Sequence, residues 1–311
     1  MTSENEKKLT FRQRTHYAGI KARKNIDCYF YIAPYFLLFT LFTVLPVIIA
    51  IYYSFTYYNV VQPPRFIGLK NYIDLFFNDE IFIKAIKNTL IISVLTGPGG
   101  YIISLIMAWF INELSPLVRA VLVTVFYAPS LTGSGMMIWS LLFSNDSYGY
   151  INAVLLNLGI ITSPINFFQN VTYMMPILII VTLWGSFGTG FLSFVAGFQT
   201  IDNSMYEAAY VEGISNRWQE LWYITLPSIK PQMMFGAVLS ITGALGCGGI
   251  GSALFGSPST DYATHTVMNH LEDYGGVRYE MGYACAIATL LFAVMLGANK
   301  LVQRVISKVG T

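Results

Sequence analysis

Long stretches of this chain contain no charged side chain at all. Only 11% of its 311 residues are Asp, Glu, Lys or Arg, against roughly 25% in an average soluble protein, which excludes an ordinary water-soluble domain. A helix that crosses the hydrocarbon core of a membrane needs about 20 predominantly apolar residues. The charge-free stretches are 28–64, 88–112, 120–145, 147–201, 232–260 and 281–299.

These stretches predict six membrane-spanning helices and an all-helical integral membrane protein. In 147–201, Asn and Gln residues interrupt the first half, so only the part from about Tyr173 predicts a span. The first stretch is too long and too far from the N-terminus for a cleaved signal peptide, and we expect it to remain as an anchor. The spans are predicted at 29–55, 86–111, 117–143, 174–198, 233–255 and 281–302. This leaves a basic N-terminal segment, 1–28, a membrane domain, 29–303, and a C-terminal tail, 304–311.

Basic residues are unequally divided between the two sides that six crossings create, and the side richer in Lys and Arg is normally cytoplasmic. One side holds Lys7, Lys8, Arg12, Arg14, Lys21, Arg23, Lys24, Arg119, Arg217, Lys230, Lys300, Arg304 and Lys308. The other holds only Arg65, Lys70, Lys84, Lys87 and Arg278. We therefore expect both termini in the cytoplasm, together with the polar segment 201–231 between spans four and five.

The segment 201–231 has the pattern of two short helices joined by a corner. Ser204 and Glu207 have the spacing of a capping box at the start of the first helix. Gly213 stands where a helix ends in the left-handed conformation. Asn216, followed by Gln219, is expected to cap the second helix, and its face is formed by Trp218, Leu221, Trp222 and Thr225. Pro227 and Pro231 are expected to end this helix before span five begins.

Two interpretations of this helical pair follow from the residues. An amphipathic hairpin could rest on lipid headgroups, but such a face normally carries several basic residues. Here Glu207, Glu212 and Glu220 balance the charge. A protein partner therefore fits better.

The segment also resembles the EAA motif of permease subunits of bacterial ATP-binding-cassette (ABC) importers. That motif is Glu-Ala-Ala, three residues, Gly, a spacer, and Ile-x-Leu-Pro. The matching residues are Glu207, Ala208, Ala209, Gly213, Ile224, Leu226 and Pro227. The spacer between Gly213 and Ile224 is one residue longer than the commonest spacing in the family, which is expected to affect the pitch of the second helix.

The resemblance extends over most of the chain, from Ile32 to Ala288. IAPYFLLFTLFTVLPVIIAIYYSFT, FIGLKNYIDLFFNDEIFIKAIKNTL, GFLSFVAGFQTI, FGSPSTDYATHT and MGYACAIA look like carbohydrate-type permeases. It implies the type I importer fold with six spans and a cytoplasmic helix-turn-helix coupling loop, in the bacterial plasma membrane. It also implies a heterodimer with a second permease, two cytoplasmic ATPase subunits, an extracytoplasmic binding protein and a sugar or oligosaccharide cargo.

In this family the two short helices sit in a socket of the ATPase, so the resemblance assigns the coupling role to Glu207, Ala208, Ala209, Gly213, Leu226 and Pro227. Ala208 and Ala209 would permit close approach, Gly213 would form the corner, and Leu226 with Pro227 would fix the exit into span five. For Glu207, a helix cap is an equally good interpretation. Trp218 and Trp222 are expected to pack against the spans of this protein.

The chain is not expected to be an enzyme. It contains no Gly-Lys pair, which the phosphate-binding P-loop requires, so ATP hydrolysis is assigned to other subunits. Three His and three Cys show no spacing typical of a metal site, a disulfide framework or a nucleophile. No catalytic residue, metal, cofactor or nucleic-acid partner is predicted.

Two segments rich in small residues are candidates for the transport path, 182–190 in span four and 240–251 in span five. Small residues also serve plain helix packing, and this alternative stays open. In the functional interpretation Trp184 stacks on a sugar, and Thr189, Ser240 and Thr242 supply hydrogen bonds beside Gly243. The family places sugar contacts on the spans flanking the EAA loop. Gly243, Ala244 and Cys247 reduce the expected polarity of this site.

An outer loop with Tyr262, His265, Glu272, Asp273, Tyr274 and Arg278, together with the loop 57–85, is a candidate surface for the binding protein, and an ordinary solvated loop is the alternative. Other cargoes, such as amino acids or phosphate, remain open. A self-contained secondary transporter would need intramembrane charges for ion coupling, and the predicted spans carry charges only within three residues of their ends. A membrane sensor is a further alternative.

Overall fold

The computed structural model describes residues 25–131 and 135–308, and the chain divides into two units at Tyr52–Tyr53. In the first unit, α3 (Ile26–Phe39), a π-helical turn (Thr40–Val44) and α4 (Leu45–Tyr53) form one helix that is continuous from Asp27 to Tyr53. None of its apolar window is buried within the protein, as expected of a span that faces lipid. The basic segment 1–28 lies mostly outside the described residues.

The second unit is a bundle of helices with one two-stranded sheet, in which β1 (Thr56–Tyr57) pairs antiparallel with β2 (Arg65–Phe66). Its first helices are α5 (Lys70–Phe77), α6 (Glu80–Asn112), α7 (Pro116–Leu131), α8 (Gly135–Leu142) and α9 (Tyr150–Asn157). They are followed by α10 (Val171–Trp184), α11 (Thr189–Gln199), α12 (Asn203–Val211), α13 (Arg217–Glu220), a π-helical turn (Leu221–Thr225) and α14 (Leu226–Ser228). The last are α15 (Lys230–Leu245), α16 (Gly249–Phe255), a 3₁₀ turn (Thr260–Tyr262), α17 (Val267–Glu272), a π-helical turn (Asp273–Val277) and α18 (Met281–Ile306).

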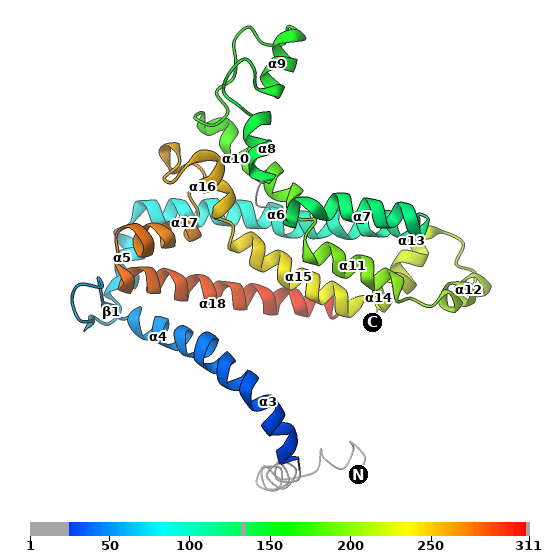
Figure 1. Cartoon of the computed structure of the whole chain (residues 1–311), viewed down its shortest axis with the longest axis horizontal. Coiled ribbons are helices and arrows are strands. Elements are labelled where there is room, and N and C mark those ends of the chain that lie inside the picture. The colour runs from blue at the N-terminus through cyan, green and yellow to red at the C-terminus, as the bar shows by residue number, and fades with distance from the viewer. Residues whose placement is uncertain (1–24, 132–134, 309–311) are drawn as a thin grey trace. The chain divides into compact units, whose positions relative to one another are not determined.

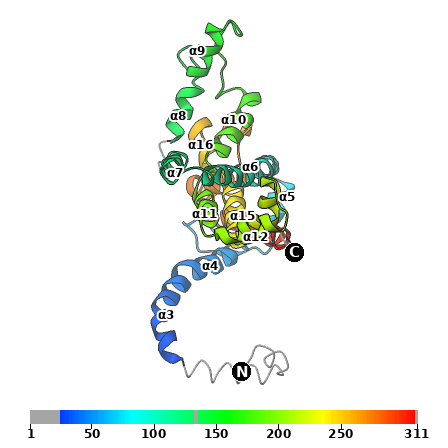
Figure 2. The same cartoon turned by 90° about the vertical axis from the view of Figure 1, so that its right-hand side faces the viewer.

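The long helices α6, α15 and α18 run side by side, and α11 packs against both α6 and α15 (Figure 1). One end of this bundle carries α5, α17 and the sheet, and the other carries α12, α13, α14 and the C-terminal end of α18 (Figure 1). Seen from the end with α12, the helices α6, α11 and α15 form one cluster (Figure 2). A hydrogen bond from Lys230 Nζ to the Ser307 carbonyl, 2.6 Å long, also joins the start of α15 to the end of α18. The loop 201–231 and the end of α18 therefore lie at the same end of the bundle.

Four helical segments within the described residues are long and apolar enough to span a membrane, and there are up to six if each of two bent pairs is one span. The predicted third span is two helices, since α7 and α8 meet at 81°. Pro129 near the end of α7 cannot donate a backbone hydrogen bond, which favours a break. The predicted fifth span is also two helices, α15 and α16, which meet at 42° across a glycine-rich break. The glycine residues at this break lower the stability of a continuous helix.

The core near the loop 201–231 is apolar and closely packed. Phe191 and Phe194 of α11 lie with Leu226, Ile229 and Met233 in one buried cluster that also includes Ala108 and Ile111 of α6. A Cβ atom on Gly236 would lie 2.6 Å from the Phe194 ring, so this glycine permits the close approach of α15 and α11. The two helices that flank the polar segment are therefore tightly coupled to each other.

Candidate functional site

The segment with the Glu-Ala-Ala motif forms the predicted pair of short helices, but its first cap differs from the prediction. Asp202 caps α12, because its Oδ1 accepts from the Ser204 amide at 3.0 Å. The predicted capping box between Ser204 and Glu207 is therefore wrong. Asp202 precedes Ser204 by two residues and is itself a favourable cap, so the helix begins earlier.

The corner between the two helices agrees with the sequence. Gly213 has a φ of +94°, a conformation that side-chain-bearing residues rarely adopt. Asn216 then caps α13, since its Oδ1 accepts from the Trp218 amide at 3.1 Å. These two predictions are confirmed.

The second helix is not ended by its prolines. It runs from α13 through the π-helical turn Leu221–Thr225 into α14, and Pro227 lies inside that last piece. The break falls at Ile229 (φ −93°, ψ 14°), and Pro231 occupies the first turn of α15, where its missing N–H costs nothing. A π-helical turn accommodates additional backbone within a helix, and it lies where the spacer before Ile224 and Leu226 is one residue longer.

The predicted coupling residues divide into buried and exposed members. Ala209 and Leu226 are buried, and Leu226 belongs to the apolar core with Ile229. Pro227 is half-buried. The exposed members are Glu207, Ala208 and Gly213. The buried residues can thus fix the helical pair on the bundle while the exposed ones face outward.

The second short helix also contacts the end of α6. Arg217 forms ion pairs with Glu113, which follows α6, at 3.0 Å, and with Glu220 at 3.1 Å. The neighbouring Glu113 and Glu220 carboxylates raise the pKa of Arg217. The Trp218 ring meets the Trp109 ring of α6 with centroids 5.2 Å apart, which fits the predicted packing of Trp218 on a span, although Trp218 and Trp222 are each 62% exposed.

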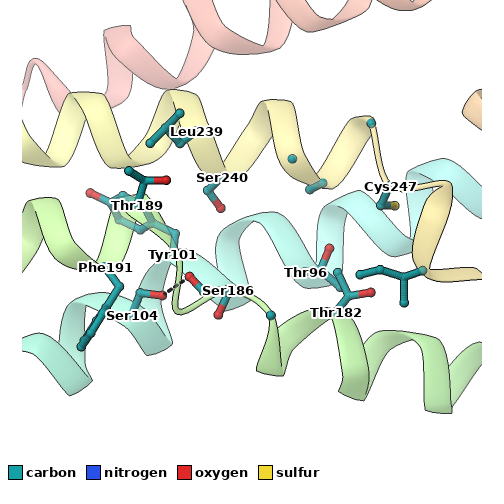
Figure 3. Close-up of a pocket in the computed structure, with 18 of the residues that line it drawn as sticks. Thr96, Tyr101, Ser104, Thr182, Ser186, Thr189, Phe191, Leu239, Ser240 and Cys247 are labelled. Carbon is teal, nitrogen blue, oxygen red and sulfur yellow. Dashed lines mark hydrogen bonds between the residues drawn. The ribbon is translucent and has the colours of Figure 1, made fainter. Parts of the chain in front are cut away.

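Between the helices of the bundle lies a cavity of about 740 Å³. Its walls come from α6, α10, α11, α15 and α16, with Met136 of α8 (Figure 3). The breaks between α10 and α11 and between α15 and α16 both border it, so backbone as well as side chains faces the space. Such a polar break within a bundle is tolerated where it lines a cavity.

Most hydroxyl groups of the cavity wall donate to backbone carbonyls. Ser240 Oγ donates to Gly97 at 2.7 Å and Ser104 Oγ to Ser186 at 3.1 Å, the bond drawn in Figure 3. Ser186 Oγ donates to Leu183 at 2.6 Å, Thr182 Oγ1 to Leu178 at 2.7 Å, and the Tyr101 hydroxyl to Met233 at 3.4 Å. Thr96 differs from these groups. Its side chain is 4% exposed, and its Oγ1 has no hydrogen-bond partner among the described residues.

The structure brings together part of the predicted transport path. Thr189, Ser240 and Gly243 line the cavity, whereas Trp184 and Thr242 are not among the described lining residues. The Trp184 ring instead packs near Trp139 and Phe187, with centroid distances of 6.0 and 6.5 Å. Its role as a sugar contact stays a prediction.

Sequence reasoning missed the contribution of α6 to the cavity. Thr96, Gly100 and Ser104 of α6 line it, and their spacing of four residues puts them on one helical face. A stripe of small and polar residues in an otherwise apolar span was the signal that could have found them. Thr182 and Ser186 were inside the segment 182–190 but were not singled out.

A second polar cluster lies at the other end of the bundle. Asp79 caps α6 by accepting from the Phe82 amide at 2.9 Å, and its Oδ2 is 2.9 Å from His270 Nε2 and 3.0 Å from the Tyr283 hydroxyl. Burial alone would raise the pKa of Asp79, but the hydrogen bonds from His270 and Phe82 and the charge of His270 bring it down to about 2. The cluster therefore holds an ionised carboxylate.

His265 adjoins this cluster, with its Nε2 3.2 Å from His270 Nδ1. Burial, followed by repulsion from His270, lowers the pKa of His265 to about 4. Since His265 is only 4% exposed, it cannot belong to an outer docking surface, contrary to one of the predicted interpretations. Glu272 and Arg278 of the same loop are exposed.

The described residues hold no group of three or more His, Cys, Asp or Glu side chains placed to bind a metal ion. A helical membrane bundle with a polar cavity, and with a protruding helical pair between two cavity-lining helices, has the architecture of a transporter permease.

This chain belongs to the family of binding-protein-dependent transport system inner membrane components, whose sequence profile matches residues 100–308. It is thus a multi-pass inner-membrane permease of an ABC transporter, and ATP hydrolysis belongs to a separate subunit. The chain is 34% identical to the probable ABC transporter permease protein YesP of Bacillus subtilis over 225 residues, 71% of each chain. It is 30% identical to the arabinooligosaccharides transport system permease protein AraP of the same organism over 272 residues, 86% of this chain and 84% of AraP.

The fold also matches a solved transporter. A bacterial ABC transporter involved in the import of the acidic polysaccharide alginate contains a chain that superimposes with a TM-score of 0.73 at 26% identity, covering 93% of this chain and 99% of that one. The same TM-score and identity hold for an alginate transporter in complex with an alginate pentasaccharide-bound periplasmic protein, with 94% and 98% covered. These matches confirm the predicted type of fold, a helical membrane permease, and the described residues contain four to six candidate spans.

Proposed function

We propose that this chain forms one half of a membrane path for oligosaccharides and is driven by ATPase subunits that bind the helical pair α12–α14. One observation carries the proposal. The helices α11 and α15 both line the cavity, and the chain between them is the helical pair itself. A force on that pair therefore reaches both cavity walls through continuous backbone.

The exposed surface of α12 supports a protein partner. Val211 is 90% exposed, and Met205 and Tyr210 are also exposed large apolar side chains beside Glu207. Apolar side chains of this kind commonly mark interaction surfaces. Ala208 and Gly213 contribute small exposed surface that permits close contact, while Ala209, Leu226 and Pro227 hold the pair against the bundle. Two ATPase subunits and a second permease would complete the transporter.

The cargo is assigned to carbohydrates. AraP is described as an arabinooligosaccharide permease and the structural relative as part of an alginate importer. In the cavity of this chain, Thr189, Ser240 and Gly243 are the proposed cargo contacts. Trp184 and Thr242 are proposed to join them when the path opens.

An extracytoplasmic binding protein is proposed to dock at the opposite end of the bundle. An open depression of about 980 Å³ lies there, and its walls include Tyr57, Phe66, Arg278 and Glu280. It combines aromatic and charged side chains, as protein-recognition surfaces do. We propose that this end faces outside and that the helical pair and both chain termini are cytoplasmic, because the distribution of Lys and Arg favours this orientation.

Reconstitution in liposomes tests the proposal. The complete set of two permeases, ATPases and binding protein should import labelled oligosaccharides only with ATP inside, and this chain alone should import none. Import by the chain alone would contradict the coupling role. Uptake of amino acids or phosphate in place of sugars would contradict the cargo.

A further inference from the structure

The cavity walls contain no charge to meet a charged cargo. None of the described lining residues is Asp, Glu, Lys, Arg or His. The sequence extends this beyond the lining residues, because the stretches 88–112, 120–145, 147–201 and 232–260 are free of Asp, Glu, Lys and Arg. A carboxylate moved from water into such a site loses hydration without gaining a counter-charge.

The hydroxyl groups of the cavity wall are also oriented so that they do not donate to a carboxylate in the cavity. A Ser, Thr or Tyr hydroxyl has a single O–H to donate and further capacity to accept. The O–H groups of Tyr101, Ser104, Thr182, Ser186 and Ser240 are directed to backbone carbonyls. What they present to the cavity are acceptor lone pairs. Sugar hydroxyls can donate to these, whereas an ionised carboxylate only accepts.

We propose that this cavity selects uncharged oligosaccharides and disfavours those built from uronic acids. The inference rests on the proposed function, since it names the class of sugar for the same cavity. Thr96 is buried and has no hydrogen-bond partner within 25–131 and 135–308, so its hydroxyl is available to a cargo. The solved transporter that is similar to this chain is involved in the import of an acidic polysaccharide, so the fold alone does not determine the charge of the cargo.

Two features of the cavity act in the opposite direction. The N-termini of α11, at Thr189 and Gly190, and of the seven-residue α16, at Gly249 and Ile250, border the space. A helix N-terminus carries the equivalent of only about half a positive charge, and its effect falls off within the first turn, so neither one equals the full charge of a uronate. The neutral side chains and the acceptor lone pairs therefore decide the preference.

The test uses the complex of both permeases and ATPases without the binding protein, so that only the membrane cavity selects. The complex is equilibrated with an equimolar mixture of trigalacturonate and its carboxyl-reduced form, galactotriose, and the bound sugar is identified by mass spectrometry. These sugars have the same linkage and length and differ at the carboxyl groups. We expect galactotriose to exceed trigalacturonate by at least about tenfold. Equal binding, or an excess of trigalacturonate, would overturn the inference.

A pair of variants links the preference to this chain. Thr189 is exposed at the cavity wall, so Thr189→Lys places a cation there and Thr189→Met is its uncharged control. The Lys variant should increase the trigalacturonate share by about tenfold, and the Met variant should leave it low. An unchanged share in Thr189→Lys would refute the cavity as the selecting element. Binding of neither sugar, while the complete transporter still imports oligosaccharides, would overturn the inference but keep the proposed function. Loss of oligosaccharide import altogether would refute the proposed function.

Discussion

The helix α6 is capped by Asp79, in a buried hydrogen-bond cluster, and is followed at its other end by Glu113, whose ion pair with Arg217 is open to solvent. Asp79 and His270 are 11% and 2% exposed in their side chains, whereas Glu113 and Arg217 are 39% and 59% exposed. Buried charges are costly to unpair, and exposed ion pairs contribute little. The difference teaches that a buried charge holds the end of α6 at Asp79, the fixed end, whereas the ion pair at the other end can be broken at small energetic cost. The helical pair at that other end is held instead by the apolar cluster that contains Leu226 and Ile229.

The largest expected effect is on uptake, and it tests whether the helical pair must be rigid. Gly213→Val forces a β-branched residue into a left-handed conformation, which costs about 1–2 kcal/mol or a displaced corner. Insertion should be normal, and ATP-driven uptake should fall at least about tenfold. The control is Gly297→Val, at an exposed helical position of α18 with no atom within 4 Å of a new Cβ. Uptake at the wild-type rate in Gly213→Val would show that the corner transmits no force.

The next effect tests the fixed end. In Asp79→Asn the helix cap is kept, because Asn is also a good cap, but the charge that His270, Tyr274 and Tyr283 contact is lost. We expect about 3 kcal/mol lower stability of the bundle, measured by thermal unfolding in detergent. The control is Glu272→Gln, which removes an exposed charge at the end of α17. Equal unfolding temperatures of the two variants would contradict the conclusion that the buried charge of Asp79 fixes this end of α6.

The fixed end should also respond to pH through His265. Its pKa is about 4 in the folded protein, below the ordinary 6.5, so the unfolded chain binds more protons between these values and stability falls as pH decreases from about 6.5 toward 4. The loss is on the order of 3 kcal/mol. The groups that set this pKa are His270 and Arg278, which lower it, and Asp273 and Asp79, which raise it.

The measurement is thermal unfolding across this pH range. His265→Gln should reduce the pH dependence of the unfolding temperature between pH 4 and 6.5. If the unfolding temperature of the variant changes with pH as much as that of the wild type, groups other than His265 cause the pH dependence.

The smallest expected effect is on stability, and it concerns the exposed ion pair at the other end of α6. Arg217→Gln should change stability by no more than about 1 kcal/mol, because the ion pair is exposed. A double-mutant cycle with Glu113→Gln should give a coupling energy in the same range. A coupling energy as large as the effect of Asp79→Asn would mean that both ends of α6 are equally fixed.

Much of the fold follows from local patterns. Charge-free stretches located the spans, and the corner at Gly213 and the cap at Asn216 followed from residue types with a single favourable backbone role. The cap at Asp202 was missed because two competing caps stand two residues apart, and sequence alone does not rank them. The bend between α15 and α16 was missed because glycine tolerates both a continuous span and a break, and neighbouring helices decide between them.

The cavity was only partly predictable. Thr189, Ser240 and Gly243 lie on the predicted path because they are small or polar residues in apolar spans. Trp184 was chosen for its chemistry, but the direction of its ring depends on Trp139 and Phe187, which meet it only in the folded bundle. The same holds for Thr96, which acquires its buried position through the packing of α6 against α10 and α15.

By itself, the sequence determined that this protein is a membrane bundle with a polar helical pair on one side, because hydrophobicity, charge asymmetry and turn chemistry act locally along the chain. Only the tertiary structure decided which hydroxyl groups face a common cavity, which carboxylate is buried with His270 and which is left exposed beside Arg217. These properties depend on distances between residues far apart in the chain, and those distances are fixed by packing.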